Sequence, residues 1–288
     1  MKPLKVVSWN VEHFNGTGGK DKNNRNLRLN RVARVVDYLA SEDPDIFGIA
    51  EVEGELVYDL FTEKMPNYTF SITEGQQTQE ILIGIKNNIT AFFTQRNEFK
   101  RNNPYLRPGA LVTVRDGNTH IPILFAHLKS MPSPEGFGLR DAMFEKIFEL
   151  KKELDKKARE LTSDNSINAS FIVLGDMNTM GMDYYRTQND ISQEREIEVI
   201  NTKFKSRKMT ALKKSHPHTF FNGSGSVYPP SNLDHVFAAD HITFADVGTT
   251  NAKVFVGGWA LQPTDANKDD WIAEFSDHAP ITFIITNA

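Results

Sequence analysis

The chain has 288 residues, of which 39% are hydrophobic, and a formal net charge of −4 at pH 7. This charge excludes a protein that binds nucleic acid through its overall charge, so a polyanion would have to meet local basic clusters. The absence of cysteine excludes a disulfide partner, cysteine-ligated metals and cysteine nucleophiles. No linker or composition break divides the sequence, and we expect residues 1–288 to form a single domain that acts as a monomer.

Two further absences bear on localisation. The N-terminal residues lack the apolar stretch of a secretory signal, and no membrane segment is predicted because no apolar run is long enough. The cytoplasm is therefore the default expectation, although a signal segment trimmed from the chain would escape this interpretation.

In chain order, the apolar pattern alternates between strand and helix. β-rich runs predict strands at 4–9, 80–86, 110–114, 121–130 and 171–175, and later at 218–221, 233–239, 242–248 and 280–286, while 43–54 predicts a turn followed by a buried strand. Apolar residues spaced by three and four predict helices at 27–39 and 139–161. The polar segment 183–214 is expected to be irregular or partly helical. Strands outnumber helices, which indicates an α/β or α+β sandwich.

Polar side chains of the types used in catalysis stand at the ends of these apolar runs: Asn10, Glu12, Glu51, His127, Asp176, Asn178, Asp234, Asp277 and His278. Each alone has an ordinary structural explanation, such as a turn residue or a helix cap. Together, carboxylates and amides are oxygen ligands suited to Mg²⁺, Mn²⁺ or Ca²⁺, and two histidines suit proton transfer. The combination predicts metal-assisted phosphoester hydrolysis.

Six short motifs follow one another in a characteristic order: "SWNVE", "GIAEVE", "FAHLKS", "LGDMNT", "SNLDHVF" and "FSDHAPI". Their series, from Trp9 to Pro280, resembles the endonuclease/exonuclease/phosphatase superfamily, which includes pancreatic-type deoxyribonucleases, sphingomyelinases and inositol polyphosphate 5-phosphatases. The resemblance implies an α+β fold, a four-layer α/β/β/α sandwich of two mostly antiparallel sheets packed face to face with helices outside.

The resemblance also implies roles around a divalent cation. Glu51 resembles the principal metal-ligand glutamate, with Asn10 supporting the metal or the phosphate and Asp277 near the metal. Glu12 stands where the abasic-site branch has an aspartate, a departure from that branch's pattern. Asp176 resembles the residue that positions or deprotonates the attacking water.

Other motif residues resemble phosphate-binding and proton-transfer groups. Asn178 resembles the partner that hydrogen-bonds the scissile phosphate. His278 resembles the histidine that contacts a phosphate oxygen and acts as an acid or a base, and Asp234 the aspartate that fixes its tautomer.

Three residues outside these pairs complete the expected site. "HLKS" with His127 is similar to the deoxyribonuclease, sphingomyelinase and phosphatase branches. Glu80 stands where deoxyribonucleases carry a glutamate that orients this histidine, or is an exposed charge at a strand start. Arg107 resembles an arginine that binds phosphate through its fork, or is a surface residue before Pro108.

The substrate class stays open between two alternatives. Two basic clusters favour a nuclease acting on DNA or RNA, because such clusters bind polyphosphates, although charge runs are also common on solvated surfaces. They comprise Lys20, Lys22, Arg25, Arg28, Arg31 and Arg34, and then Lys203, Lys205, Arg207, Lys208, Lys213 and Lys214. The alternative is a phosphomonoesterase or small-molecule phosphodiesterase acting on nucleotides, inositol phosphates or lipid head groups.

Overall fold

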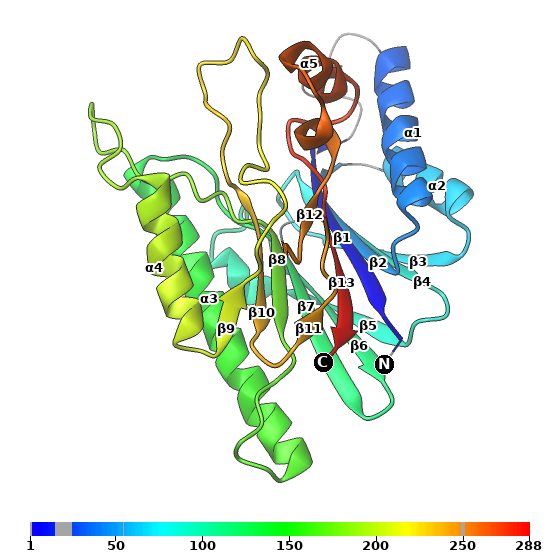
Figure 1. Ribbon diagram of the computed structural model, residues 1–288, viewed down its shortest axis with the longest axis vertical. Coiled ribbons are helices and arrows are strands. Elements are labelled where there is room, and N and C mark those ends of the chain that lie inside the picture. Colours follow the sequence, from blue (N-terminus) through cyan, green and yellow to red (C-terminus); the bar gives the residue numbers. More distant parts are fainter. Residues whose placement is uncertain (1, 15–24, 54, 249–250) are drawn as a thin grey trace.

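The computed structural model describes residues 2–14, 25–53, 55–248 and 251–288, apart from the side chains of residues 25–29, 55 and 56. Two β-sheets pack face to face, and helices cover their outer surfaces (Figure 1). In the first sheet the strand order is β11-β13-β1-β2-β4-β3, and β12 also pairs with β13. Its strands are β1 (Leu4–Phe14), β2 (Ile46–Val52), β3 (Tyr68–Ile72), β4 (Glu80–Lys86), β11 (Thr243–Phe244), β12 (Phe255–Val256) and β13 (Ile281–Asn287).

The second sheet has the order β5-β6-β7-β8-β10-β9. Its strands are β5 (Ala91–Arg96), β6 (Gly109–Asp116), β7 (Thr119–His127), β8 (Ile172–Asp176), β9 (Met209–Ala211) and β10 (Asp234–Ala239). Each sheet contains one parallel pair, β1 with β2 and β7 with β8, and the other pairings are antiparallel. The predicted α+β sandwich of two mostly antiparallel sheets is confirmed.

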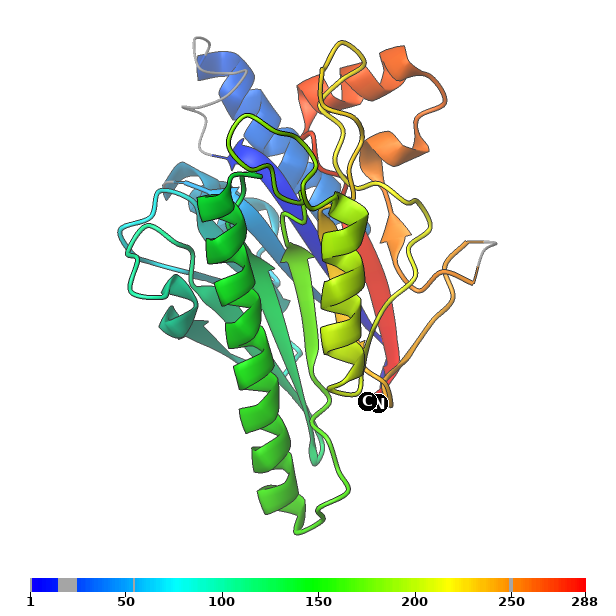
Figure 2. The same cartoon turned by 90° about the vertical axis from the view of Figure 1, so that its left-hand side faces the viewer.

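Helices cover both outer faces. Their bounds are α1 (Arg25–Glu42), α2 (Glu55–Lys64), α3 (Pro134–Thr162), α4 (Gln193–Lys205) and α5 (Asp265–Glu274), with 3₁₀ turns η2 (Asn97–Lys100) and η3 (Gly258–Leu261). α1 and α2 lie on the first sheet, and α3 and α4 lie side by side on the second (Figure 2). Serine side chains cap α3 and α4, because Ser133 accepts from Gly136 N–H and Ser192 from Arg195 N–H.

Strand alternation separates the core into three apolar layers. In β1, Leu4 and Val6 join the layer between the sheets, whereas Val7 and Trp9 join the layer under α1 and α2. A third layer fills the space between the second sheet and the helices α3 and α4. The polar side chains that follow on the inter-sheet faces are therefore brought to one end of the central layer.

Several secondary-structure predictions need correction. The run 218–221 is no strand, because Phe220 makes only isolated bridges to Ser231 and His278. The run 242–248 shortens to the two residues of β11. The outer strands β3 and β5, the short strands β9 and β12, and the helices α2 and α5 were not predicted. Among the described residues, no helix has the length and apolar character needed to cross a bilayer.

Candidate active site

Three predicted residues stand side by side at the ends of neighbouring strands in the second sheet. The register pairs His127 of β7 with Asp176 of β8, and Asp176 with Asp234 of β10. Each lies two residues along its strand from a residue of the inter-sheet core: Phe125, Leu174 and Val236, respectively. Since alternate residues share one face of a strand, all three polar side chains lie on the inter-sheet face. All three side chains are almost fully buried.

Glu51 reaches the same place by a backbone irregularity. Phe47 and Ile49 face α1 and α2, so regular alternation would turn Glu51 away from the second sheet. The pairing of β2 with β4 shifts register between Ala50 and Val52, and Glu51 has a φ of 66°. This bulge re-aims the glutamate toward the inter-sheet end, as bulges beside functional sites do.

Asn10 links the two sheets. Its Nδ2 donates to Glu51 Oε1 at 3.1 Å in its own sheet and to Asp176 Oδ2 at 2.9 Å in the facing sheet. His127 Nε2 lies 3.7 Å from the same Glu51 oxygen and 3.6 Å from the same Asp176 oxygen. Two carboxylates from different sheets thus converge on one amide and one imidazole.

Asp176 has a second set of neighbours, His278 and Asp234. His278 Nε2 lies 3.8 Å from Asp176 Oδ2, and its Nδ1 is hydrogen-bonded to Asp234 Oδ2 at 2.8 Å. Asp234 is fixed in turn by Thr219, whose hydroxyl accepts from its backbone N–H at 2.9 Å. The expected Asp234–His278 pair is present, and the ring of Phe220 packs on the imidazole at 5.2 Å between centroids.

The turn after β8 fixes Asp176 and brings Asn178 beside it. Asn178 donates its backbone N–H to Asp176 Oδ1 at 2.9 Å, an Asx turn, and its side chain donates to Leu128 O at 3.1 Å. Gly175 has a φ of 126°, and a Cβ there would lie 2.2 Å from Ala126 O of the neighbouring strand. Only glycine therefore fits between β7 and Asp176.

Gly175→Ala should destabilise the fold by at least about 1–3 kcal/mol, because it combines an unfavourable φ with a backbone clash. The matched control is Gly117→Ala, since Gly117 has a φ of 60° but open space around a Cβ. Urea unfolding of both variants measures the difference. Equal loss of stability would show that the approach of Ala126 does not require glycine.

Burial and neighbouring charges shift the pKa values of the two histidines in opposite directions. Burial lowers the pKa of His127 well below its ordinary value, and Arg107 and His278 lower it further. Burial also acts to lower the pKa of His278, but Asp234, Asp176 and Asp277 outweigh it and raise that pKa well above its ordinary value. The surroundings therefore shift the pKa values of the two imidazoles in opposite directions, a division typical of sites that move protons.

Asp176 lies between these groups. Burial raises the pKa of its carboxyl, and the charge of Asp234 raises it further, while His278 and hydrogen bonds from Asn10 and Asn178 act to lower it. A carboxylate with a raised pKa is a stronger base than one in water, which is what proton abstraction near neutral pH requires.

Arg107 and Asp277 also lie near these groups. Burial lowers the pKa of Arg107, whereas the nearby charges of Glu51, Asp176 and Glu80 raise it, so its guanidinium lies in the field of the carboxylates. Its Nε is buried and makes no hydrogen bond with the described residues. Asp277 is half-buried next to His278, and its backbone oxygen accepts from Trp259 Nε1 at 3.1 Å.

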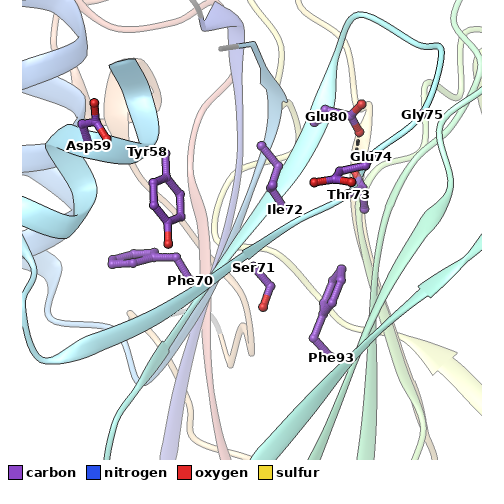
Figure 3. A pocket seen from close by; sticks show the side chains of 10 residues that line it. All are labelled: Tyr58, Asp59, Phe70, Ser71, Ile72, Thr73, Glu74, Gly75, Glu80 and Phe93. Carbon is purple, nitrogen blue, oxygen red and sulfur yellow. Dashed lines mark hydrogen bonds between the residues drawn. The ribbon is translucent and has the colours of Figure 1, made fainter. Parts of the chain in front are cut away.

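The predicted contact between Glu80 and His127 is wrong. Glu80 accepts hydrogen bonds from Thr73 Oγ1 at 2.5 Å and from Gln77 Nε2 at 2.7 and 2.8 Å. The buried Nδ1 of His127 has no hydrogen-bond partner among the described residues. Instead, Glu80 lines a cleft of about 1050 Å³ between the sheet edges β3 and β5, with Phe70, Ile72 and Phe93 (Figure 3).

Gln79 is a site residue that the sequence interpretation missed. Its Nε2 donates to Glu51 Oε2 at 2.7 Å, and the backbone N–H of His13 donates to the same oxygen at 2.9 Å. Strand alternation was the available signal. Gln79 is an even number of residues from Ile81 and Ile83, so it lies on the same inter-sheet face, whereas Glu80 lies on the opposite face.

The structure describes only part of the first basic cluster. Lys20 and Lys22 lie outside the described residues, as do the side chains of Arg25 and Arg28. Arg31 is buried and donates to the backbone oxygens of Val11, Glu12 and Phe275.

Most of the second cluster lies toward the end of β10 that is far from Asp234. α4 leads away from the site end (Figure 2), and Met209, next to Lys208, pairs with Ala239 at the far end of β10 from Asp234. Lys214 does lie near the site, but its ammonium is taken up by Asn232 Oδ1 and Asp234 O.

The donor set fits a hard divalent cation. Glu51 Oε1 and Asp176 Oδ2 both converge on the Asn10 amide, and a buried carboxylate beside a second, partly buried one calls for a positive counter-charge. Asp176, Asp234 and His278 form a second group whose ligand atoms lie within 4.8 Å of one another. In that group Asp234 is already bonded to the imidazole, whereas Glu51 and Asn10 supply carboxylate and amide oxygens, the ligand types that hard cations prefer.

Three solved structures share the fold over nearly the whole chain. Truncated Caenorhabditis elegans TDP2 is 16% identical, with a TM-score of 0.64, covering 100% of this chain and 98% of that one. D. rerio TDP2 complexed with a single-strand DNA product is 16% identical with a TM-score of 0.62, covering 100% of each chain. The Bacteroides thetaiotaomicron mannosyl-6-phosphatase is 16% identical with a TM-score of 0.59, covering 98% of this chain and 99% of the other.

Sequence comparison identifies the family although no curated protein matches the chain significantly. The sequence model described as the Endonuclease/Exonuclease/phosphatase family matches residues 7–278, from β1 to the histidine before β13. Members of this family are phosphoester hydrolases that generally depend on a divalent metal. Since the match covers most of both sheets and the motifs up to His278, the chain belongs to the endonuclease/exonuclease/phosphatase family.

Proposed function

We propose that the chain hydrolyses phosphodiester bonds in DNA or RNA, as a monomer, in a reaction that depends on Mg²⁺ or Mn²⁺. The observation that carries the proposal is the position of Asp176 Oδ2. It accepts from Asn10 at 2.9 Å and lies within 4 Å of the nitrogens of His127 and His278. A basic carboxylate between a neutral and a charged imidazole suits proton removal from water beside a bound phosphate.

In this mechanism Asp176 takes a proton from the water that attacks phosphorus, and the bond to the leaving oxygen breaks. Asn178, fixed by Leu128, hydrogen-bonds a phosphate oxygen. His278, kept charged by Asp234, faces the phosphate and stabilises its developing charge or protonates the leaving oxygen. Arg107 binds the phosphate from the side of the carboxylates, where its Nε is free of hydrogen bonds to the described residues.

Glu51 and Asn10 would hold the cation, with Asp277 nearby. When bound there, a divalent cation supplies positive charge that offsets the phosphate and activates water. Gln79 and the backbone of His13 keep Glu51 in place through its second oxygen, Oε2, and leave Oε1 directed at Asn10. This arrangement supports Glu51 as the residue that presents an oxygen to the ion.

A substrate panel tests the proposal. Purified protein is incubated with Mg²⁺ or Mn²⁺ and with plasmid DNA, single-stranded RNA, bis-p-nitrophenyl phosphate or p-nitrophenyl phosphate. Cleavage of a nucleic acid and of the diester supports the nuclease assignment. Hydrolysis of the monoester alone would contradict it.

Glu51→Gln should raise the Mg²⁺ concentration needed for half-maximal activity by roughly tenfold or more, since one anionic oxygen ligand is lost. The measurement is an activity titration with Mg²⁺, supported by metal binding in a calorimeter. Glu42→Gln is the control, because Glu42 pairs with Lys5 at the other end of the sheet. An activation curve for Glu51→Gln that overlays the wild type would remove Glu51 from the metal site.

A phosphomonoesterase or a hydrolase of small phosphodiesters is the second candidate. Lys203, Lys205, Arg207 and Lys208 lie away from Asp176, so they would not contact a polymer bound across the site. A small phosphorylated substrate needs no extended basic surface. The solved mannosyl-6-phosphatase shares the fold, which is compatible with such a substrate.

A further inference from the structure

A fully buried arginine lies behind the proposed site. Arg140, in the second turn of α3, has no exposed surface, and its guanidinium contacts two segments that follow catalytic strands. Nη1 donates to Lys129 O and Met131 O at 3.2 Å each, and Nη2 donates to Gly181 O at 2.9 Å. The first segment leaves β7 after His127, and the second leaves β8 after Asp176.

Glu196 completes this contact from α4. Its carboxylate accepts from Arg140 Nε at 2.7 Å and from Nη2 at 3.0 Å, a paired geometry that fixes the guanidinium plane. Its Oε2 also accepts from the backbone N–H of Gly181 at 2.7 Å. Both polar groups of Gly181 are therefore held by one ion pair.

The two segments also contact each other at the site. Leu128 N–H donates to Asp176 O at 2.9 Å, and Asn178 Nδ2 donates to Leu128 O at 3.1 Å. A shift of either segment would therefore move His127, Asp176 and Asn178 relative to one another.

We propose that Arg140 and Glu196 are positioning residues, which hold the segments after β7 and β8 so that Asp176 and Asn178 keep their geometry at the phosphate. The inference rests on the proposed hydrolase activity, and neither side chain contacts the reacting groups. Displacement of catalytic groups by about 1 Å costs up to roughly 10²-fold in rate. The pair should therefore affect kcat beyond its contribution to stability.

The chain offers a matched control in the same helix. Lys151 in α3 is equally buried and forms an ion pair with Asp155, which also accepts from Ala169 N–H at 2.8 Å. Ala169 precedes β8 at the end opposite Asp176. Both ion pairs therefore anchor α3 to backbone near β8, but only Arg140 anchors it at the catalytic end.

The experiment compares Arg140→Ala with Lys151→Ala at a temperature where circular dichroism shows both folded. Both should lower Tm by a similar amount. Arg140→Ala should lower kcat on bis-p-nitrophenyl phosphate by roughly 10-fold to 10²-fold with KM little changed, whereas Lys151→Ala should keep near wild-type kcat. Arg140→Lys should recover part of the lost rate, because lysine keeps the charge and some donors.

Amide hydrogen exchange gives a readout that does not need activity. Arg140→Ala should speed exchange in residues 128–132 and 177–182, and Lys151→Ala should not. If Arg140→Ala does not fold, Glu196→Gln against Asp155→Asn makes the same comparison. Equal effects of the two pairs on kcat and exchange would overturn the inference. An inactive wild type with the expected exchange pattern would instead count against the proposed function alone.

Discussion

Asp176→Asn should lower kcat for phosphodiester hydrolysis by roughly 10²-fold or more, with Tm close to that of the wild type. Asparagine keeps the size of the side chain and an oxygen for the Asn178 N–H, but it cannot take a proton from water. Burial raises the pKa of this carboxyl, so removing the ionised form relieves a cost in the folded state, which offsets the loss of the hydrogen bond that Asn10 donates to Asp176 Oδ2. The substitution should therefore lower kcat strongly and change the thermal stability little.

Steady-state kinetics and thermal unfolding of the same preparations check this result. Asp45→Asn is the control, because Asp45 is a half-buried carboxylate at the start of β2, hydrogen-bonded to Lys5 N at 2.8 Å and far from Glu51 along that strand. The control should keep near wild-type kcat. Near-full activity in Asp176→Asn would exclude Asp176 as the base.

The sequence predicted the part of the site that follows from strand alternation. His127 and Asp176 end apolar runs and Asp234 begins one. Each has the side-chain alternation of the buried layer, so a straight strand carries it to the inter-sheet end. Neighbouring strands in register then place them in a row. The roles proposed for these three residues came from the family resemblance.

The rest depends on local departures from regular geometry. Glu51 has the wrong parity for the site and reaches it only through the bulge at φ 66°. Its assignment came from the family resemblance, since alternation alone would have pointed it at α1 and α2. Glu80 shows the opposite case. Its place in the sequence fitted the family pattern, but strand alternation puts its side chain on the other face from Gln79, where it bonds Thr73.

Outer elements were missed for a different physical reason. The outer strands β3 and β5 are only partly buried along their length, so neither presents the continuous apolar run that identified the central strands. The basic clusters could not be placed relative to the site, because sequence spacing does not say which end of a helix faces the site. Lys203, near the end of α4, pairs with Glu145 of α3 and does not face Asp176.

His278→Gln should lower kcat by roughly 10²-fold or more on a nucleic acid substrate. Glutamine can still donate to Asp234, so the buried carboxylate is not left without a partner, but it carries neither charge nor a transferable proton. Kinetics on a defined oligonucleotide measure the loss. His241→Gln serves as the control, since His241 is hydrogen-bonded to Ser170 Oγ at 3.0 Å at the far end of β8.

The leaving group then separates the two roles proposed for His278. p-Nitrophenolate departs without a proton, whereas a sugar oxygen needs one, so a general acid matters less for bis-p-nitrophenyl phosphate than for an oligonucleotide. If His278 protonates the leaving oxygen, His278→Gln should lose far more rate on the oligonucleotide than on the p-nitrophenyl diester. If the charged imidazole instead stabilises the phosphate, the two losses should be similar. A variant that keeps wild-type rates on both substrates would remove His278 from the mechanism and leave its buried ion pair with Asp234 as a structural contact.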